Sequence, residues 1–197
     1  MGIITNFNII IIIYNDTNNN NHCTSFSGTL PSAVCNLTML ESLEIPFNRF
    51  YGLLPSCLFN QLVNQQNLRS LVLSNNFFRG HLPEKTYLPK LYDLFLESNL
   101  FSGTIPRSFL LKMKTLEYLA LGSNNFSLSE APDLRDLDNI IYIDMSNCNL
   151  QGRLPELNMN KTHLKQFSAN NNILSGTVPA SFSNATKLLV ISLYNNR

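Results

Sequence analysis

Apolar residues return along the chain in one fixed arrangement. In each unit an apolar residue is followed by two variable positions, then by two more apolar residues separated by one variable residue. Alternation of this kind is typical of a short strand with one buried face. Seven units begin 23 to 28 residues apart, at Leu40, Leu68, Leu91, Leu116, Ile140, Leu164 and Leu188. A regular period of this length predicts a solenoid of stacked turns rather than a globular domain with one active-site pocket.

The alternation also predicts which strand side chains face the interior. The inward pairs are Leu43/Ile45, Leu71/Leu73, Leu94/Leu96, Leu119/Leu121, Ile143/Met145 and Phe167/Ala169. The residues between and beside them are expected to point outward and to form columns across neighbouring strands.

An asparagine follows each strand at a fixed distance, where the chain must bend inward. The column consists of Asn48, Asn76, Asn99, Asn124, Asn172 and Asn196, with Cys148 as the exception. An amide side chain carries two donors and an oxygen that can accept two hydrogen bonds, so it can satisfy backbone groups left unpaired by the bend. We therefore expect a structural ladder of stacked Asn side chains.

A glycine and a proline close each unit. The glycines are Gly28, Gly52, Gly80, Gly103, Gly152 and Gly176, each followed two residues later by Leu, Ile or Val and then by Pro. Glycine permits a tight bend, and proline fixes φ for an extended segment.

The combined pattern, L-x-x-L-x-L-x-x-N-x-F/L-x-G-x-L/I-P, resembles the plant-type leucine-rich repeat of receptor-like kinase and receptor-like protein ectodomains. The resemblance covers about Phe26 to Asn196, roughly seven turns. It implies an α/β repeat solenoid, a right-handed leucine-rich repeat horseshoe with a concave parallel β-sheet and a convex side of 3₁₀ or irregular segments.

Two stretches depart from the pattern. In the turn that starts at Leu116, Leu128, Glu130 and Ala131 replace the glycine, the apolar residue and the proline. The segment Ser127–Asn139 is either a specialised loop or, the interpretation we favour, a degenerate turn held by its neighbours. An insertion around Phe59–Gln66 predicts a longer outer segment.

The ends of the chain lack the pattern. We expect residues 1–22 to form an irregular Asn/Ile-rich leader and residues 23–197 to form the solenoid, uncapped at the C-terminus. Projecting the period backward places Asp16, Asn19 and Asn21 at positions that a strand would have to bury. The apolar run Ile9–Ile13 is instead expected to be able to pair as an added edge strand. These features suggest an internal fragment of a longer protein or an imperfect gene model.

The four cysteines do not form a redox or zinc motif. Cys148 takes the place of a ladder Asn, and we expect it to be buried and unpaired. Cys35 and Cys57 occupy outer segments of adjacent turns but are out of phase by two residues, which argues against a disulfide between them.

Four N-x-S/T sequons fall on positions predicted to face outward, and Asn15 begins a fifth in the leader. The four are candidate glycosylation sites: Asn36, Asn125, Asn160 and Asn184. An Asn-rich chain also produces sequons by chance. Together with the plant-type repeat, they favour an extracellular or cell-surface protein.

The sequence carries no motif that indicates enzymatic chemistry, a cofactor or a metal site. His22, His81 and His163 occupy unrelated repeat positions and are expected at the surface. The net charge of +1, with 14% charged residues and no basic run, gives no basis for nucleic-acid binding. No apolar run is long enough to span a membrane, although a parent protein could be membrane-anchored.

The outward columns contain one candidate recognition surface. The residues Phe95, Tyr118 and Tyr142 are expected to form an aromatic patch bordered by Asp93, Glu97 and Asp144. Exposed aromatics beside small residues are typical of binding hot spots, and the acidic border suits a partner with a basic group. The equally weighted alternative is that β-propensity alone placed aromatics on the strands.

Three functional hypotheses remain open. We favour a non-enzymatic ectodomain that binds a protein or peptide ligand on its concave face, as in receptor-like signalling or defence proteins. A secreted structural or polygalacturonase-inhibitor-like protein is the alternative, and an intracellular scaffold is a third.

Overall fold

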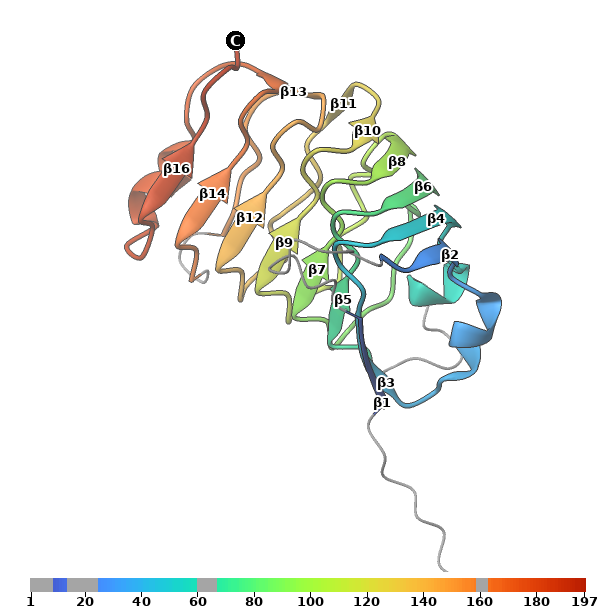
Figure 1. The fold of residues 1–197 in the computed structure, drawn as a ribbon. Coiled ribbons are helices and arrows are strands. Elements are labelled where there is room, and N and C mark those ends of the chain that lie inside the picture. Colours follow the sequence, from blue (N-terminus) through green and yellow to red (C-terminus); the bar gives the residue numbers. More distant parts are fainter. Residues whose placement is uncertain (1–8, 14–24, 60–66, 159–162) are drawn as a thin grey trace, which may run out of the picture.

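The computed structural model describes residues 9–13, 25–59, 67–158 and 163–197, and its main element is a parallel sheet of eight strands (Figure 1). The predicted solenoid with a parallel sheet along its concave face is confirmed. In spatial order the strands are β1 (Ile9–Ile12), β3 (Leu40–Glu44), β5 (Ser70–Val72), β7 (Asp93–Phe95), β9 (Tyr118–Ala120), β12 (Tyr142–Asp144), β14 (Gln166–Ser168) and β16 (Val190–Ser192).

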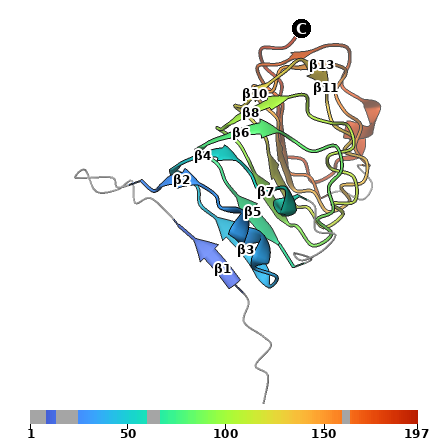
Figure 2. The ribbon, with the colours of Figure 1, turned by 90° about the vertical axis from the view of Figure 1, so that its right-hand side faces the viewer.

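A second row of short strands follows the bend at the Asn ladder and lies beside the first sheet (Figure 2). A five-stranded sheet contains β2 (Ser27–Thr29), β4 (Arg49–Leu53), β6 (Phe77–His81), β8 (Leu100–Gly103) and β10 (Asn125–Phe126). A separate three-stranded sheet contains β11 (Ser129–Glu130), β13 (Leu150–Gly152) and β15 (Ile173–Leu174). Three 3₁₀ helices lie in the outer segments: η1 (Ser32–Asn36), η2 (Ser56–Leu58) and η3 (Ala180–Asn184).

The core is a continuous strip between the sheets and the outer segments. All six inward pairs predicted from the alternation are buried, with exposed fractions of 0–1%. The last strand differs, because Ile191 occupies the equivalent inward position and is 43% exposed. Strand β16 has a neighbour on one side only among the described residues, so Ile191 is covered from that side alone.

The Asn side chains connect each turn to the one before it. The Nδ2 of Asn99 donates to the Leu96 carbonyl of its own turn at 3.2 Å and to the Leu73 carbonyl of the preceding turn at 2.9 Å. Its Oδ1 accepts from the Phe78 backbone N–H at 3.0 Å. The same arrangement recurs at Asn48, Asn76, Asn124, Asn172 and Asn196. The predicted ladder is confirmed.

Strand β1 is attached to the sheet by both backbone and ladder contacts. It pairs in parallel with β3, so the predicted edge strand is confirmed. The Nδ2 of Asn48 donates to the Ile13 carbonyl at 3.0 Å, the contact that Asn99 makes to Leu73. Asp16, Asn19 and Asn21 lie outside the described residues. The boundary between a leader at 1–22 and a solenoid at 23–197 therefore stays a prediction.

The turn that starts at Leu116 keeps its interior while its outer half departs from the pattern. Phe126, Leu134 and Leu137 are buried at 0–1% exposure. Ser129 lies opposite Leu150, the place that the glycine takes in a regular turn such as Gly152 opposite Leu174. This one-residue slip separates β10 from β11 and divides the second row of strands into two sheets, which supports the interpretation of a degenerate turn.

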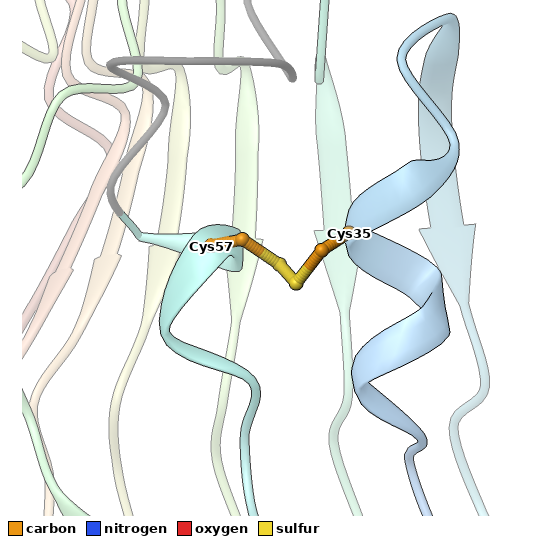
Figure 3. Close-up of a disulfide and its surroundings, with 2 residues drawn as sticks. All are labelled: Cys35 and Cys57. Atoms are coloured by element: carbon orange, nitrogen blue, oxygen red, sulfur yellow. A yellow bond between two sulfur atoms is a disulfide. The ribbon is translucent and has the colours of Figure 1, made fainter.

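The prediction about Cys35 and Cys57 was wrong: they form a disulfide (Figure 3). The two-residue phase difference does not separate them, because η1 and η2 differ in length and bring the two Cα atoms to 5.7 Å, within the usual range for a disulfide. Cys148 is buried and free, as predicted. Its Sγ lies 3.5 Å from the Leu121 carbonyl, and burial raises the pKa of its thiol.

The ladder can be tested by substitution at an intact rung and at the exceptional one. Asn99→Ala should lower the free energy of unfolding by about 1–3 kcal/mol, because it leaves buried backbone groups of two turns unpaired. Cys148→Asn should leave stability unchanged or raise it, because it restores an amide at this rung. Thermal and denaturant unfolding measure both. An Asn99→Ala variant that melts like the wild type would show that the ladder contributes nothing.

Candidate functional site

The register of the main sheet brings the predicted recognition residues onto three neighbouring strands. Asp93, Tyr118 and Tyr142 lie opposite one another on β7, β9 and β12. In the next outward row, Phe95, Ala120 and Asp144 face one another in the same way. Glu97 follows β7 by two residues and so belongs to the row beyond.

The six predicted residues are accessible, unlike the inward strand positions beside them. Tyr118 is 36% exposed, and the other five are partly exposed. Between them the outward positions hold small residues, Ala120 and Gly122, which are buried. We define these six residues, Asp93, Phe95, Glu97, Tyr118, Tyr142 and Asp144, as the concave site. Its accessible aromatic and acidic side chains surround Ala120 and Gly122, which form the floor of the site.

Gly122 keeps the floor of the concave site open between the two carboxylates. A Cβ at this position would lie 2.9 Å from the Ser146 carbonyl oxygen and 3.1 Å from Asp144 Oδ2. The Ser146 backbone N–H donates to Asp144 Oδ1 at 2.9 Å, which fixes that carboxylate beside Gly122. On the other side, Glu97 Oε2 is buried and accepts no hydrogen bond among the described residues.

The electrostatic environment of the concave site disfavours negative charge. Burial raises the pKa of Asp93, and the nearby Glu44 and Glu117 raise it further. Burial also raises the pKa of Glu97, with a contribution from Asp144. The pKa of Tyr142 is raised by burial and then by Asp144 and Glu97. The carboxylates therefore act on one another without a basic side chain in the outward columns to neutralise them.

Two contributors were missed when the sequence alone was considered. Glu44 occupies the outward position between Leu43 and Ile45 and was not included in the predicted surface, and Glu117 lies one position before Tyr118. The sequence feature that could have identified Glu117 is its position directly after Leu116, the apolar residue that begins the unit. Both act on the concave site through charge, raising the pKa of Asp93.

The candidate glycosylation sites are accessible where the structure describes them. Asn36, Asn125 and Asn184 are exposed, and Asn160 lies outside the described residues. His81 and His163 are exposed, as expected, while His22 is outside the described part of the chain. Within the described ranges, no group of three or more His, Cys, Asp or Glu side chains is arranged to hold a metal ion. Nor does that part of the chain contain a helix long and apolar enough to cross a membrane.

Comparison with known proteins identifies similar sequences and folds. A family model described as Leucine Rich Repeat matches residues 67–86 and 139–160. Receptor-like protein 39 of Arabidopsis thaliana is 36% identical over 153 residues, which make up 77% of this chain and 17% of that protein. The crystal structure of a TDR receptor superposes with a TM-score of 0.72 at 32% identity, covering 87% of this chain and 29% of that one.

A further similar structure was determined with a ligand. It is the leucine-rich repeat ectodomain of the Arabidopsis receptor kinase HAESA in complex with an N-terminally extended IDA peptide hormone. The TM-score is 0.61 at 30% identity, over 86% of this chain and 32% of that one. The chain spans only 16–18% of the length of the curated relatives that it matches first.

The raised pKa of Glu97 gives a pH-dependent prediction. A carboxyl whose folded pKa is raised opposes folding once it ionises, so its cost is absent below the ordinary pKa and present at neutral pH. Glu97→Gln should therefore raise the melting temperature at pH 7, and the gain should shrink as the pH falls toward the ordinary value of 4.5.

Asp133→Asn is the control of opposite sign. The hydrogen bond from Arg135 lowers the pKa of Asp133, so this substitution should lower the melting temperature at pH 7, by an amount that disappears as the pH falls below 3.8. If Glu97→Gln lowers the melting temperature at pH 7 as Asp133→Asn does, the assigned electrostatics of the concave site are incorrect.

Proposed function

Because the chain is a plant-type leucine-rich repeat domain that resembles the ectodomains of receptor-like kinases and receptor-like proteins, we propose that it recognises a protein or peptide ligand on its concave face. The recognition would serve receptor-like signalling or defence and would involve no catalysis by this chain. The ligand would contact the concave site, with Tyr118 and Tyr142 as its aromatic anchors.

The observation that carries this proposal is the arrangement of Phe95, Tyr118 and Tyr142 around a low floor on adjacent strands. Aromatic side chains supply large contact areas, and clusters of them near the centre of a surface are typical of hot spots. The carboxylates at the border favour a ligand that presents a basic group. The similar HAESA ectodomain, which binds a peptide hormone, supports peptide as the ligand class.

An extracellular location is part of the same proposal. The Cys35–Cys57 disulfide is of a kind that persists in oxidising compartments. Three described sequons are accessible to a glycosyltransferase, at Asn36, Asn125 and Asn184. A secreted structural or polygalacturonase-inhibitor-like protein shares these features, and its recognition surface would be tested in the same way.

The concave site can be tested by removing its two tyrosine rings. A random-peptide phage library selected on the chain should yield clones enriched in Lys and Arg whose binding is lost in the Tyr118→Ala/Tyr142→Ala variant. The melting curve should be nearly unchanged, because both side chains point away from the core. Tyr51→Ala/Phe77→Ala, which removes exposed aromatics from the five-stranded sheet, is the matched control and should retain these clones.

Two results would contradict this assignment. One is a selection in which every clone binds the Tyr118→Ala/Tyr142→Ala variant with wild-type affinity. The other is a set of clones without an excess of basic residues, which would remove the role assigned to Glu97 and Asp144.

Glycosylation tests the location. Expressed in its native tissue, the protein should lose mass on treatment with an N-glycosidase, and Asn36→Gln or Asn184→Gln should each remove one glycan's mass. Native protein whose mass does not change on treatment would favour the intracellular scaffold instead.

A further inference from the structure

The outer face of the five-stranded sheet carries large apolar side chains in contact with solvent. Tyr51 and Leu53 on β4 are 54% and 66% exposed, and Phe77 on β6 is 50% exposed. Leu100 at the start of β8 is 49% exposed. On each strand these side chains alternate with buried positions, Gly52 on β4, Phe78 on β6 and Phe101 on β8, so the strand geometry presents them outward.

The register makes these residues one continuous surface. Tyr51 lies opposite Phe77 on neighbouring strands. In the next outward row Leu53 lies opposite Arg79, which lies opposite Leu100. Because neighbouring strands are about 4.8 Å apart, the four apolar side chains and Arg79 adjoin one another. We call the set Tyr51, Leu53, Phe77, Arg79 and Leu100 the lateral face.

A hollow opens beside the lateral face. A cavity of about 350 Å³ is lined by Leu53, Phe59 and Phe101, with Arg79, His81 and Lys85 among its polar walls. Leu53 lies close over Gly80 at the edge of the hollow. Gly80 has a φ of 109°, and a Cβ there would lie 2.7 Å from Leu53 Cδ2. A side chain at position 80 would push Leu53 away and change the shape of the hollow.

The charged side chains of the lateral face and of the hollow are basic. Arg49, Arg79, His81 and Lys85 lie on or beside it, and no acidic side chain lines the hollow. Arg79 and Lys85 form no ion pair with any described residue. Glu84, between Pro83 and Lys85 in the sequence, lines the adjoining cavity together with His81. The three-stranded sheet differs, because Glu130 is paired with Arg107 there.

We propose that the lateral face is a second docking surface, for a protein segment that places an apolar side chain in the hollow and carboxylates against Arg79, His81 and Lys85. Four half-exposed apolar residues on regular strands are typical of an interaction surface rather than scattered exposure. Charge complementarity selects an acidic partner. A second copy of the chain does not fit by a two-fold contact, since that would place the basic side chains against themselves.

This proposal is independent of the ligand on the concave site. The concave site is aromatic and acidic, whereas the lateral face is apolar and basic. The two surfaces lie on different sheets (Figure 2). One chain could therefore hold a basic ligand and an acidic partner simultaneously.

The same random-peptide phage library tests the lateral face when clones that also bind a lateral-face variant are removed. Clones that bind the wild-type chain but not the Leu53→Ser/Arg79→Glu variant should be enriched in Asp and Glu next to aromatic or aliphatic residues. Synthetic peptides from these clones should bind the variant at least tenfold more weakly than the wild type, measured by fluorescence polarisation. Both substituted side chains are exposed, so the variant should keep the wild-type melting curve.

Two controls separate this result from the concave site and from general charge. The Tyr118→Ala/Tyr142→Ala variant should bind the acidic peptides normally. Arg153→Glu, an exposed basic residue directly after β13 of the three-stranded sheet, should also leave binding unchanged. The proposal is overturned if no clone depends on Leu53 and Arg79, if the dependent clones lack an acidic excess, or if Arg153→Glu weakens binding as much as the double variant.

Discussion

The structure depends on one requirement: each bend from the main sheet must satisfy the backbone groups that it takes out of pairing. The Asn ladder meets this requirement. Each Asn side chain donates to backbone carbonyls of its own turn and of the preceding turn, and it accepts from a backbone N–H of the preceding turn. Because unpaired buried backbone groups cost about 1–3 kcal/mol each, every rung opposes the separation of two turns. The solenoid is thereby held turn by turn.

Stabilisation shared between neighbours explains why individual turns can depart from the pattern. The turn at Leu116 loses its glycine and proline yet keeps Asn124 and Phe126 in place. Cys148 interrupts the ladder, and Asn172 accepts from both the Cys148 and Leu150 backbone N–H groups. At the first rung Asn48 bonds the Ile13 carbonyl, so the ladder also holds a strand that lies outside the repeat period.

The parts of the fold that could be predicted are those determined by local geometry. The alternation predicted which side chains are buried, and the spacing of the Asn residues predicted the ladder. The Cys35–Cys57 disulfide could not be predicted, because the outer segments vary in length and their relative phase depends on packing. The contribution of Glu117 to the concave site likewise follows from its distance to Asp93 in the folded sheet. The register of the columns was predictable; the burial and repulsion that raise the pKa of Glu97 required the structure.

The same bend that requires the ladder also creates two surfaces of different character. Outward residues of the strands before the bend form the concave columns, which contain acidic but no basic side chains. Outward residues after the bend belong to strands whose glycines let neighbouring side chains lie flat, as Leu53 does over Gly80. The ladder residues are buried or half-buried and their side chains bond the backbone, so the variable positions on either side can change without loss of the fold. A repeat of this design can therefore evolve its concave site and its lateral face separately, because neither contributes a side chain to the Asn ladder.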